Sequence, residues 1–229
     1  MAFSDKDKRV SYVLKCIVII FAIAGIILSA HAGRKSFMGG NRVFMYFTIQ
    51  SNLVIAFFCL YGAILLKTGR HIKNSWYVIK FVGTVSITLT GVVFCFILAP
   101  VLGKHAWNLQ NVFTHVIVPI VAVIDFFVTG IYGSIKWQNV FFVALPPLLY
   151  AIYAGIGYAA GWEFAPGTRY PYFFLNWGSP AGAFGFTKGI PYMGCVWWIL
   201  LLCVFLFAVG FLYLFMLNVL KRLRHKTRM

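Results

Sequence analysis

Residues 43–66, VFMYFTIQSNLVIAFFCLYGAILL, decide the fold of this chain. The stretch is apolar and long enough to cross a bilayer as a helix, which needs roughly 20 residues. At ~100° per residue, Thr48, Ser51 and Asn52 fall within one third of the helix circumference. Because lipid does not tolerate such a polar face, we expect it to point into a protein interior or a wet cavity. The structural alternative is that these side chains bond to the carbonyl one turn earlier, or hold helices together.

The composition is that of an integral membrane protein. Hydrophobic residues make up 62% of the 229 residues and charged residues 10%, whereas soluble domains carry about 25% charged residues. Lys and Arg outnumber Asp and Glu by 20 to 4, but they lie at segment ends and in short loops. They therefore predict topology and lipid-headgroup contacts, and not nucleic-acid binding. The five cysteines form neither a metal-ligand spacing nor a CxxC motif, so we expect no metal and no cofactor.

Further apolar segments predict a single all-α membrane domain over residues 1–229, with six transmembrane helices. The expected helices span residues of about 11–32, 43–66, 76–102, 109–133, 140–160 and 192–219. The first resembles a signal peptide ending in Ala30-His31-Ala32, and we expect it to be retained as a helix. Residues 161–191 form the one long connection, which we call the cap. It is too aromatic for a solvated loop, and predicts either a lid or an interfacial belt.

Counts of Lys and Arg near the helix ends predict that both termini are cytoplasmic. With the N-terminus inside, fourteen of the twenty basic residues lie on the inner side and six on the outer side. The inner set is Lys6, Lys8, Arg9, Lys15, Lys67, Arg70, Lys73, Lys80, Lys136, Lys221, Arg222, Arg224, Lys226 and Arg228. The outer set is Arg34, Lys35, Arg42, Lys104, Arg169 and Lys188. The second and fourth helices then both start on the outer side.

The fourth expected helix, LQNVFTHVIVPIVAVIDFFVTG, carries a second polar stripe. Its members lie within about 60° of one line at the helical period; they are Asn111, Thr114, His115, Asp125 and Thr129. A histidine in a membrane span is a functional candidate by default, although it can also serve as a hydrogen bond between helices. Pro119 follows His115 by one turn and has no N–H for the His115 carbonyl, so it predicts a kink or a plain bend there.

Thr48 and His115 each lie about five or six residues into their helices, ~8 Å below the outer boundary. A hydroxyl and an imidazole at equal depth are able to meet, and a neutral imidazole can accept the threonine proton. That is the minimum for an activated oxygen nucleophile, at a depth suited to an acyl ester. Asp125 lies ~15 Å further along the helix axis and cannot touch the imidazole, and Glu163 reaches it only if the cap folds inward. We therefore expect a Thr–His dyad.

The remaining polar residues have less defined roles. Asn52, Asn108 and Asn111 are candidate donors to an oxyanion, and the sequence selects none of them. Lys80 and Asp125 are expected to neutralise each other as a buried structural pair, with a proton relay as the alternative.

The pieces YFTIQSN, THVIVPIVAVID and RYPYFFLNW resemble the androgen-induced-gene family of six-helix membrane proteins and its bacterial relatives. That group includes the ADTRP-like threonine hydrolases of fatty acid esters of hydroxy fatty acids. The resemblance implies that Thr48 is the nucleophile and His115 the base. The chain differs from the animal hydrolases directly after the threonine, where they carry a more apolar run. The expected substrate-binding residues are Asn52, Asn111, Trp107, Tyr170, Tyr172 and Trp177.

Two other functions stay open at this point. The polar stripes could line the path of a small-solute transporter or channel, or the protein could bind lipid without catalysis. The expected partners are membrane lipid and a lipid ester substrate, without nucleic acid, and the oligomeric state is not determined. The geometry of Thr48 and His115 distinguishes the hypotheses, since a dyad needs hydrogen-bond contact and transport needs a path across the bilayer.

Overall fold

The computed structural model describes residues 4–32 and 40–226 as an all-helical structure. The prediction of six helices long and apolar enough to cross a membrane is confirmed. In chain order they are α1 (Asp5–Ala32), α2 (Phe47–Thr68), α3 continued by η3, α4 and η4 (Asn74–Ala106), α5 continued by η5 and α6 (Leu109–Gly130), η6 continued by α7 (Trp137–Ala159), and α8 (Cys195–Lys226). These features are those of a multi-pass membrane protein.

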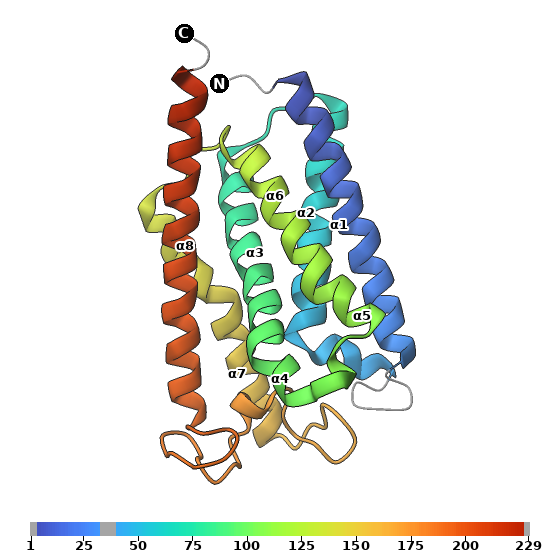
Figure 1. The fold of residues 1–229 in the computed structure, drawn as a ribbon, viewed down its shortest axis with the longest axis vertical. Coiled ribbons are helices and arrows are strands. Elements are labelled where there is room, and N and C mark those ends of the chain that lie inside the picture. The colour runs from blue at the N-terminus through green and yellow to red at the C-terminus, as the bar shows by residue number, and fades with distance from the viewer. Residues whose placement is uncertain (1–3, 33–39, 227–229) are drawn as a thin grey trace.

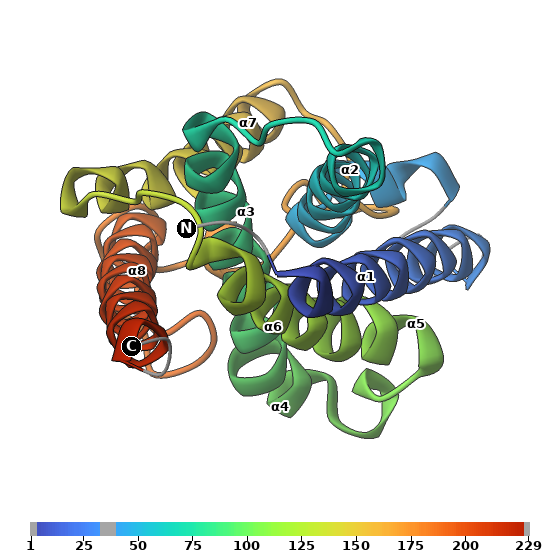
Figure 2. The same cartoon turned by 90° about the horizontal axis from the view of Figure 1, so that it is seen from above.

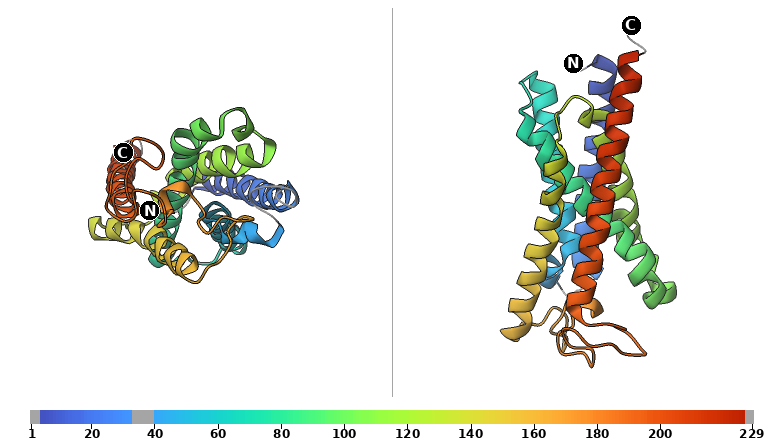
Figure 3. Two further views of the ribbon diagram at one scale, coloured as in Figure 1. Left: turned by 90° about the horizontal axis from the view of Figure 1, so that it is seen from below. Right: turned by 90° about the vertical axis from the view of Figure 1, so that its left-hand side faces the viewer.

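The helix α3 (Asn74–Val93) lies between two groups of helices (Figure 1, Figure 2). On one side it packs with α2 and α6 (Val118–Gly130), which both also pack on α1, and on the other with η6 (Trp137–Ala144) and α8. The start of α1 and the end of α8 lie at one end of the bundle, and the cap covers the opposite end (Figure 1, Figure 3). Buried residues of α3 belong to two apolar cores, a large one shared with α6, η6, α7 and α8 and a small one shared with α1, α2 and α6.

Two helix boundaries differ from the sequence prediction for local reasons. The second helix begins at Phe47 and not at residue 43, because Gly40–Met45 form the 3-10 turn η2 and Tyr46 has extended backbone angles, φ −93° and ψ 137°. The third helix passes Pro100 and ends at Ala106. The π-helical turn η3 (Phe94–Leu98) precedes that proline and rearranges the backbone bonds that it would otherwise break.

The first and last helices extend beyond their apolar runs. The α1 helix starts at Asp5 and α8 ends at Lys226. Arg224 donates two hydrogen bonds to Asp7, at 2.5 and 2.7 Å, and Tyr132 also donates to Asp7. This cluster gives the polar helix ends partners, so they stay helical at the end of the bundle that carries both termini.

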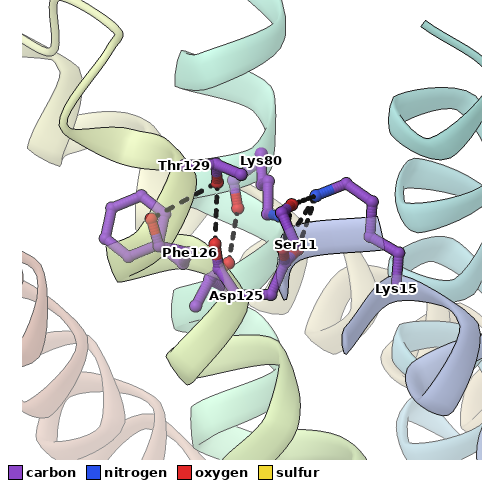
Figure 4. Close-up of polar contacts among 7 residues, drawn as sticks. Ser11, Lys15, Lys80, Asp125, Phe126 and Thr129 are labelled. Carbon is purple, nitrogen blue, oxygen red and sulfur yellow. Dashed lines mark hydrogen bonds and ion pairs between the residues drawn. The ribbon is translucent and has the colours of Figure 1, made fainter. Parts of the chain in front are cut away.

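The buried pair of Lys80 and Asp125 is present, but a second lysine shares the carboxylate (Figure 4). Lys15 lies 2.8 Å from Asp125, and Ser11 donates to the same carboxylate at 2.6 Å. Lys15 and Lys80 are 0% and 1% exposed. They therefore do not mark a membrane side, and counting them as topology signals was wrong; Arg34, Lys35 and Arg228 lie outside the described residues.

Candidate active site

Thr48 and His115 are in hydrogen-bond contact, with 3.2 Å between Oγ1 and Nε2. Thr48 is the second residue of α2, and His115 lies in the π-helical turn η5 (Phe113–Ile117) between α5 (Leu109–Val112) and α6. Thr48 lies less far into its helix than expected. The two still meet, because η2 occupies the outermost residues of the apolar stretch. Both side chains are 7% exposed.

The turn η5 places His115 through two departures from regular helix. The Val118 N–H bonds to the Phe113 carbonyl five residues earlier, and Pro119 has no N–H for the His115 carbonyl. That carbonyl lies against Gly91 of α3, where a Cβ atom would come within 2.9 Å of it. The absence of a side chain at Gly91 therefore lets α3 approach the loosened turn.

The hydrogen bonds around the imidazole determine which nitrogen carries the proton. Nδ1 of His115 lies 3.1 Å from the Asn111 carbonyl and 3.0 Å from Oγ1 of Thr114. The Thr114 hydroxyl donates its only proton to the Gln110 carbonyl at 2.8 Å. Both neighbours of Nδ1 are therefore acceptors, and Nδ1 carries the hydrogen. This leaves the Nε2 lone pair facing the Thr48 hydroxyl, which is the arrangement of a general base and its nucleophile.

A stack of rings holds the imidazole from the side. Phe94 of η3 lies parallel to His115, with ring centroids 3.9 Å apart and an interplanar angle of 20°. Trp107 contacts Phe94 edge to face at 5.6 Å and is 56% exposed. Trp107 thus contacts Phe94 and not His115. It supports the ring that stacks on the imidazole and lies outside the site. Sequence reasoning missed Phe94, because its stacking depends on how two separate π-helical turns cross.

The cap brings Tyr172 onto the start of α2. The Thr48 N–H donates to the Tyr172 hydroxyl at 3.3 Å, and that hydroxyl lies 3.4 Å from Oγ1 of Thr48. The Tyr172 ring stacks on Phe174 with centroids 5.1 Å apart. The Tyr46 hydroxyl donates to the Phe164 carbonyl at 3.0 Å and so fastens the cap to the start of α2. The cap packs across the bundle end as a lid does.

The three asparagines do not face the Thr48 hydroxyl as oxyanion donors. Asn52 donates to the Thr48 carbonyl at 2.8 Å and to the Thr114 carbonyl at 3.0 Å, so its N–H groups tie α2 to η5. Asn111 donates its side-chain amide to the Ala106 carbonyl, and Asn108 donates to the His105 carbonyl. Asn111 acts on the site through its backbone oxygen, which holds Nδ1 of His115.

The other expected site residues lie elsewhere. Tyr170 and Trp177 belong to the cap but do not line the cavity at Thr48. The Trp177 indole lies against α7 (Leu145–Ala159), 3.6 Å from where a Cβ of Gly155 would be. Glu163 forms a half-exposed ion pair with Arg42 at 3.2 Å. It therefore does not orient His115, in keeping with a dyad.

A narrow apolar cavity of about 60 Å³ opens beside Thr48, between α2, α3, α7 and α8 and beneath the cap. Its lining comprises Phe47, Thr48, Leu89, Thr90, Val93, Leu98, Pro147, Leu148, Tyr150, Ala151, Tyr172, Phe174, Leu175, Ile199, Leu202, Cys203 and Leu206. A larger groove of about 820 Å³ runs between α2, α3 and α7. Phe47 and Tyr150 line both spaces, and their ring centroids lie 5.3 Å apart. These two rings therefore belong to the walls of both spaces.

Comparison of the chain with protein-family models, with curated proteins and with solved structures gives no match.

Proposed function

We propose that this protein is a membrane-embedded threonine hydrolase of lipid esters, with fatty acid esters of hydroxy fatty acids as the substrate class. The observation that carries the proposal is the Thr48 hydroxyl donating to Nε2 of His115, at the wall of an apolar cavity. A buried hydroxyl next to a correctly protonated imidazole is the unit that other hydrolases use for acyl transfer.

The reaction follows from these two groups. Thr48 Oγ1 attacks the ester carbonyl carbon, its proton passes to Nε2 of His115, and the carbonyl electron pair moves to oxygen. The tetrahedral intermediate expels the alcohol, which takes the proton from His115, and leaves an acyl ester on Thr48. Water then attacks this ester with His115 again as base, and the fatty acid leaves with Thr48 restored. The Asn111 carbonyl keeps Nδ1 protonated throughout.

A lipid substrate suits the surroundings of the dyad. The cavity is lined almost entirely by apolar side chains of membrane-spanning helices. The adjoining groove between α2, α3 and α7 gives an acyl chain a lateral route from the bilayer, past Phe47 and Tyr150. With both termini cytoplasmic, as the excess of basic residues at their end favours, the dyad and the cap belong to the outer leaflet.

The transport alternative meets a physical obstacle between the two polar clusters. The Thr48 site and the Asp125 network are separated by a packed apolar layer within the described residues. That layer contains Val18, Ala22, Ile55, Ala56, Cys59, Ile87, Val118 and Ala122, of which the most exposed, Ala56, is 6% exposed. An ion or polar solute would have to cross this layer without polar partners, which is costly. Lipid binding without catalysis uses the same cavity, and only activity separates it from hydrolysis.

The deciding experiment is hydrolysis of branched fatty-acid esters by purified protein in detergent, together with fluorophosphonate labelling. Thr48 should displace fluoride from phosphorus and become phosphonylated, and Thr48→Ala should abolish both labelling and turnover. Thr84→Ala is the matched control, because the Thr84 hydroxyl is buried and donates to the Lys80 carbonyl of its own helix. Equal hydrolysis by wild type and Thr48→Ala would refute the proposal and favour lipid binding or transport.

A further inference from the structure

We infer that the Tyr172 hydroxyl and the Thr48 N–H together form the oxyanion hole of this site, so that the cap supplies a catalytic group. The inference rests on the proposed hydrolase function. It assigns the donors that the asparagines do not provide, since the side-chain amides of Asn52, Asn108 and Asn111 donate to backbone carbonyls.

The Thr48 N–H is available because of its position in α2. The N–H groups of the first helical turn have no carbonyl partner within the helix. Ile49 and Gln50 both bond to the Tyr46 carbonyl, at 3.1 Å each. The Thr48 N–H bonds to the Tyr172 oxygen at 3.3 Å. Tyr46 gives no side-chain cap to the helix, so the positive end of the helix dipole is directed at the same place.

Counting protons around Oγ1 shows where the Tyr172 hydrogen points. The Thr48 hydroxyl has one proton, and it is directed to Nε2 of His115, a lone pair without a hydrogen. In the 3.4 Å contact between the two hydroxyls, Tyr172 is therefore the donor and Oγ1 the acceptor. Tyr172 thus accepts from the Thr48 N–H and donates toward Oγ1. Both donors lie beside the atom that attacks, which is where the negative carbonyl oxygen develops.

The phenol is suited to this task. Burial raises the pKa of the Tyr172 hydroxyl above its ordinary value, so it stays protonated and able to donate at neutral pH. The dry surroundings strengthen a hydrogen bond to a charged oxygen more than one to a neutral carbonyl. In the reaction, the oxyanion accepts hydrogen bonds from the Tyr172 hydroxyl and the Thr48 N–H, in place of their present acceptors, Oγ1 of Thr48 and the Tyr172 oxygen.

The test is Tyr172→Phe, which removes one oxygen and keeps the ring, with Tyr170→Phe as a control from the same cap. We expect kcat to fall about 100-fold or more in Tyr172→Phe, with KM nearly unchanged and slower fluorophosphonate labelling of Thr48. Tyr170→Phe should behave as wild type. The fall should shrink with a thionoester, whose sulfur accepts hydrogen bonds weakly, an effect that a purely structural role would not produce.

A second variant covers the case in which Tyr172→Phe does not fold. Incorporation of 3,5-difluorotyrosine at position 172 keeps the shape and makes the phenol more acidic, so activity should be lost at a lower alkaline pH than in wild type. Wild-type kcat in Tyr172→Phe, or an unchanged alkaline limb with difluorotyrosine, would overturn the oxyanion assignment while Thr48→Ala inactivity upholds the hydrolase. Absence of turnover and labelling in wild type would overturn both.

Discussion

Oγ1 of Thr48 lies 3.2 Å from Nε2 of His115, although 67 residues separate the two in the chain. The contact joins the first turn of α2, which directly follows the extended backbone of Tyr46, to the π-helical turn η5 between α5 and α6. Such π-helical turns are rare and often lie at functional sites. Among the described residues no carboxylate bonds to the imidazole, and the Asn111 carbonyl takes that position.

Removal of either member of the dyad should abolish turnover without unfolding the protein. Thr48→Ala and His115→Ala should each lower kcat/KM by more than about 1000-fold, and the double variant should be no worse than either single one, because members of one catalytic unit fail together. Thr48→Ser should retain activity, since the hydroxyl stays and only the methyl group that restricts χ1 is lost. Steady-state kinetics measure kcat/KM, and circular dichroism checks that each variant is folded. Additive losses of kcat/KM in the double variant would contradict a shared step.

The rate should depend on pH in two directions. Protonation of His115 at acid pH removes the base, so kcat/KM should fall as the pH is lowered. On the alkaline side, burial raises the pKa of Tyr172, so its donor proton should persist through mildly alkaline pH and the rate should fall only above its ordinary range. The dependence of kcat/KM on pH is measured over the pH range in which the protein stays folded. In Tyr172→Phe we expect the fall in rate at alkaline pH to disappear. If the alkaline fall persists in this variant, a group other than Tyr172 causes it.

The Asp125 network should respond unequally to neutralisation of its members. Asp125→Asn leaves Lys15 and Lys80 buried without a counter-charge and should cost about 3–5 kcal/mol. Lys80→Met leaves the pair of Lys15 and Asp125 intact at 2.8 Å, so its cost should be smaller. Thermal stability and folded yield in detergent provide the measurement, with exposed Lys73→Met as the control. If Lys80→Met lost more stability than Asp125→Asn, sharing of the Asp125 carboxylate by two lysines would not explain the stability of this network.

Gly91 should control the position of His115. A Cβ in Gly91→Ala would lie 2.9 Å from the His115 carbonyl and 3.2 Å from Pro119, so η5 must shift away from α3. We expect kcat to fall more than about tenfold, because a displacement of about 1 Å at a catalytic group has a large effect. Gly189→Ala is the control, since no atom lies within 4 Å of its added methyl group. Full activity in Gly91→Ala would show that η5 can move without disturbing the dyad.

The two ends of the bundle should be accessible from opposite sides of the membrane. Ser4 directly precedes α1, and Thr168 lies in the cap; the start of α1 and the cap lie at opposite ends of the bundle (Figure 1). Single cysteines at these positions, in a background without the native cysteines, should react with an impermeant thiol reagent from the cytoplasmic side for Ser4→Cys and from the outer side for Thr168→Cys. Cytoplasmic labelling of Thr168→Cys would invert the topology and place the dyad in the inner leaflet.

The sequence alone determined the helical membrane class, the number of spans and the polar faces of the second and fourth spans. It also indicated Thr48, His115 and the pairing of Lys80 with Asp125. These properties depend on hydropathy and on the helical period, which are local along the chain. Only the tertiary structure decided that Lys15 joins Asp125, that Asn52 and Asn111 bond to backbone carbonyls, and that Tyr172, and not Tyr170 or Trp177, reaches Thr48. Those contacts depend on how each helix is rotated against its neighbours and on how the cap folds over the bundle, and neither leaves a periodic pattern in the sequence.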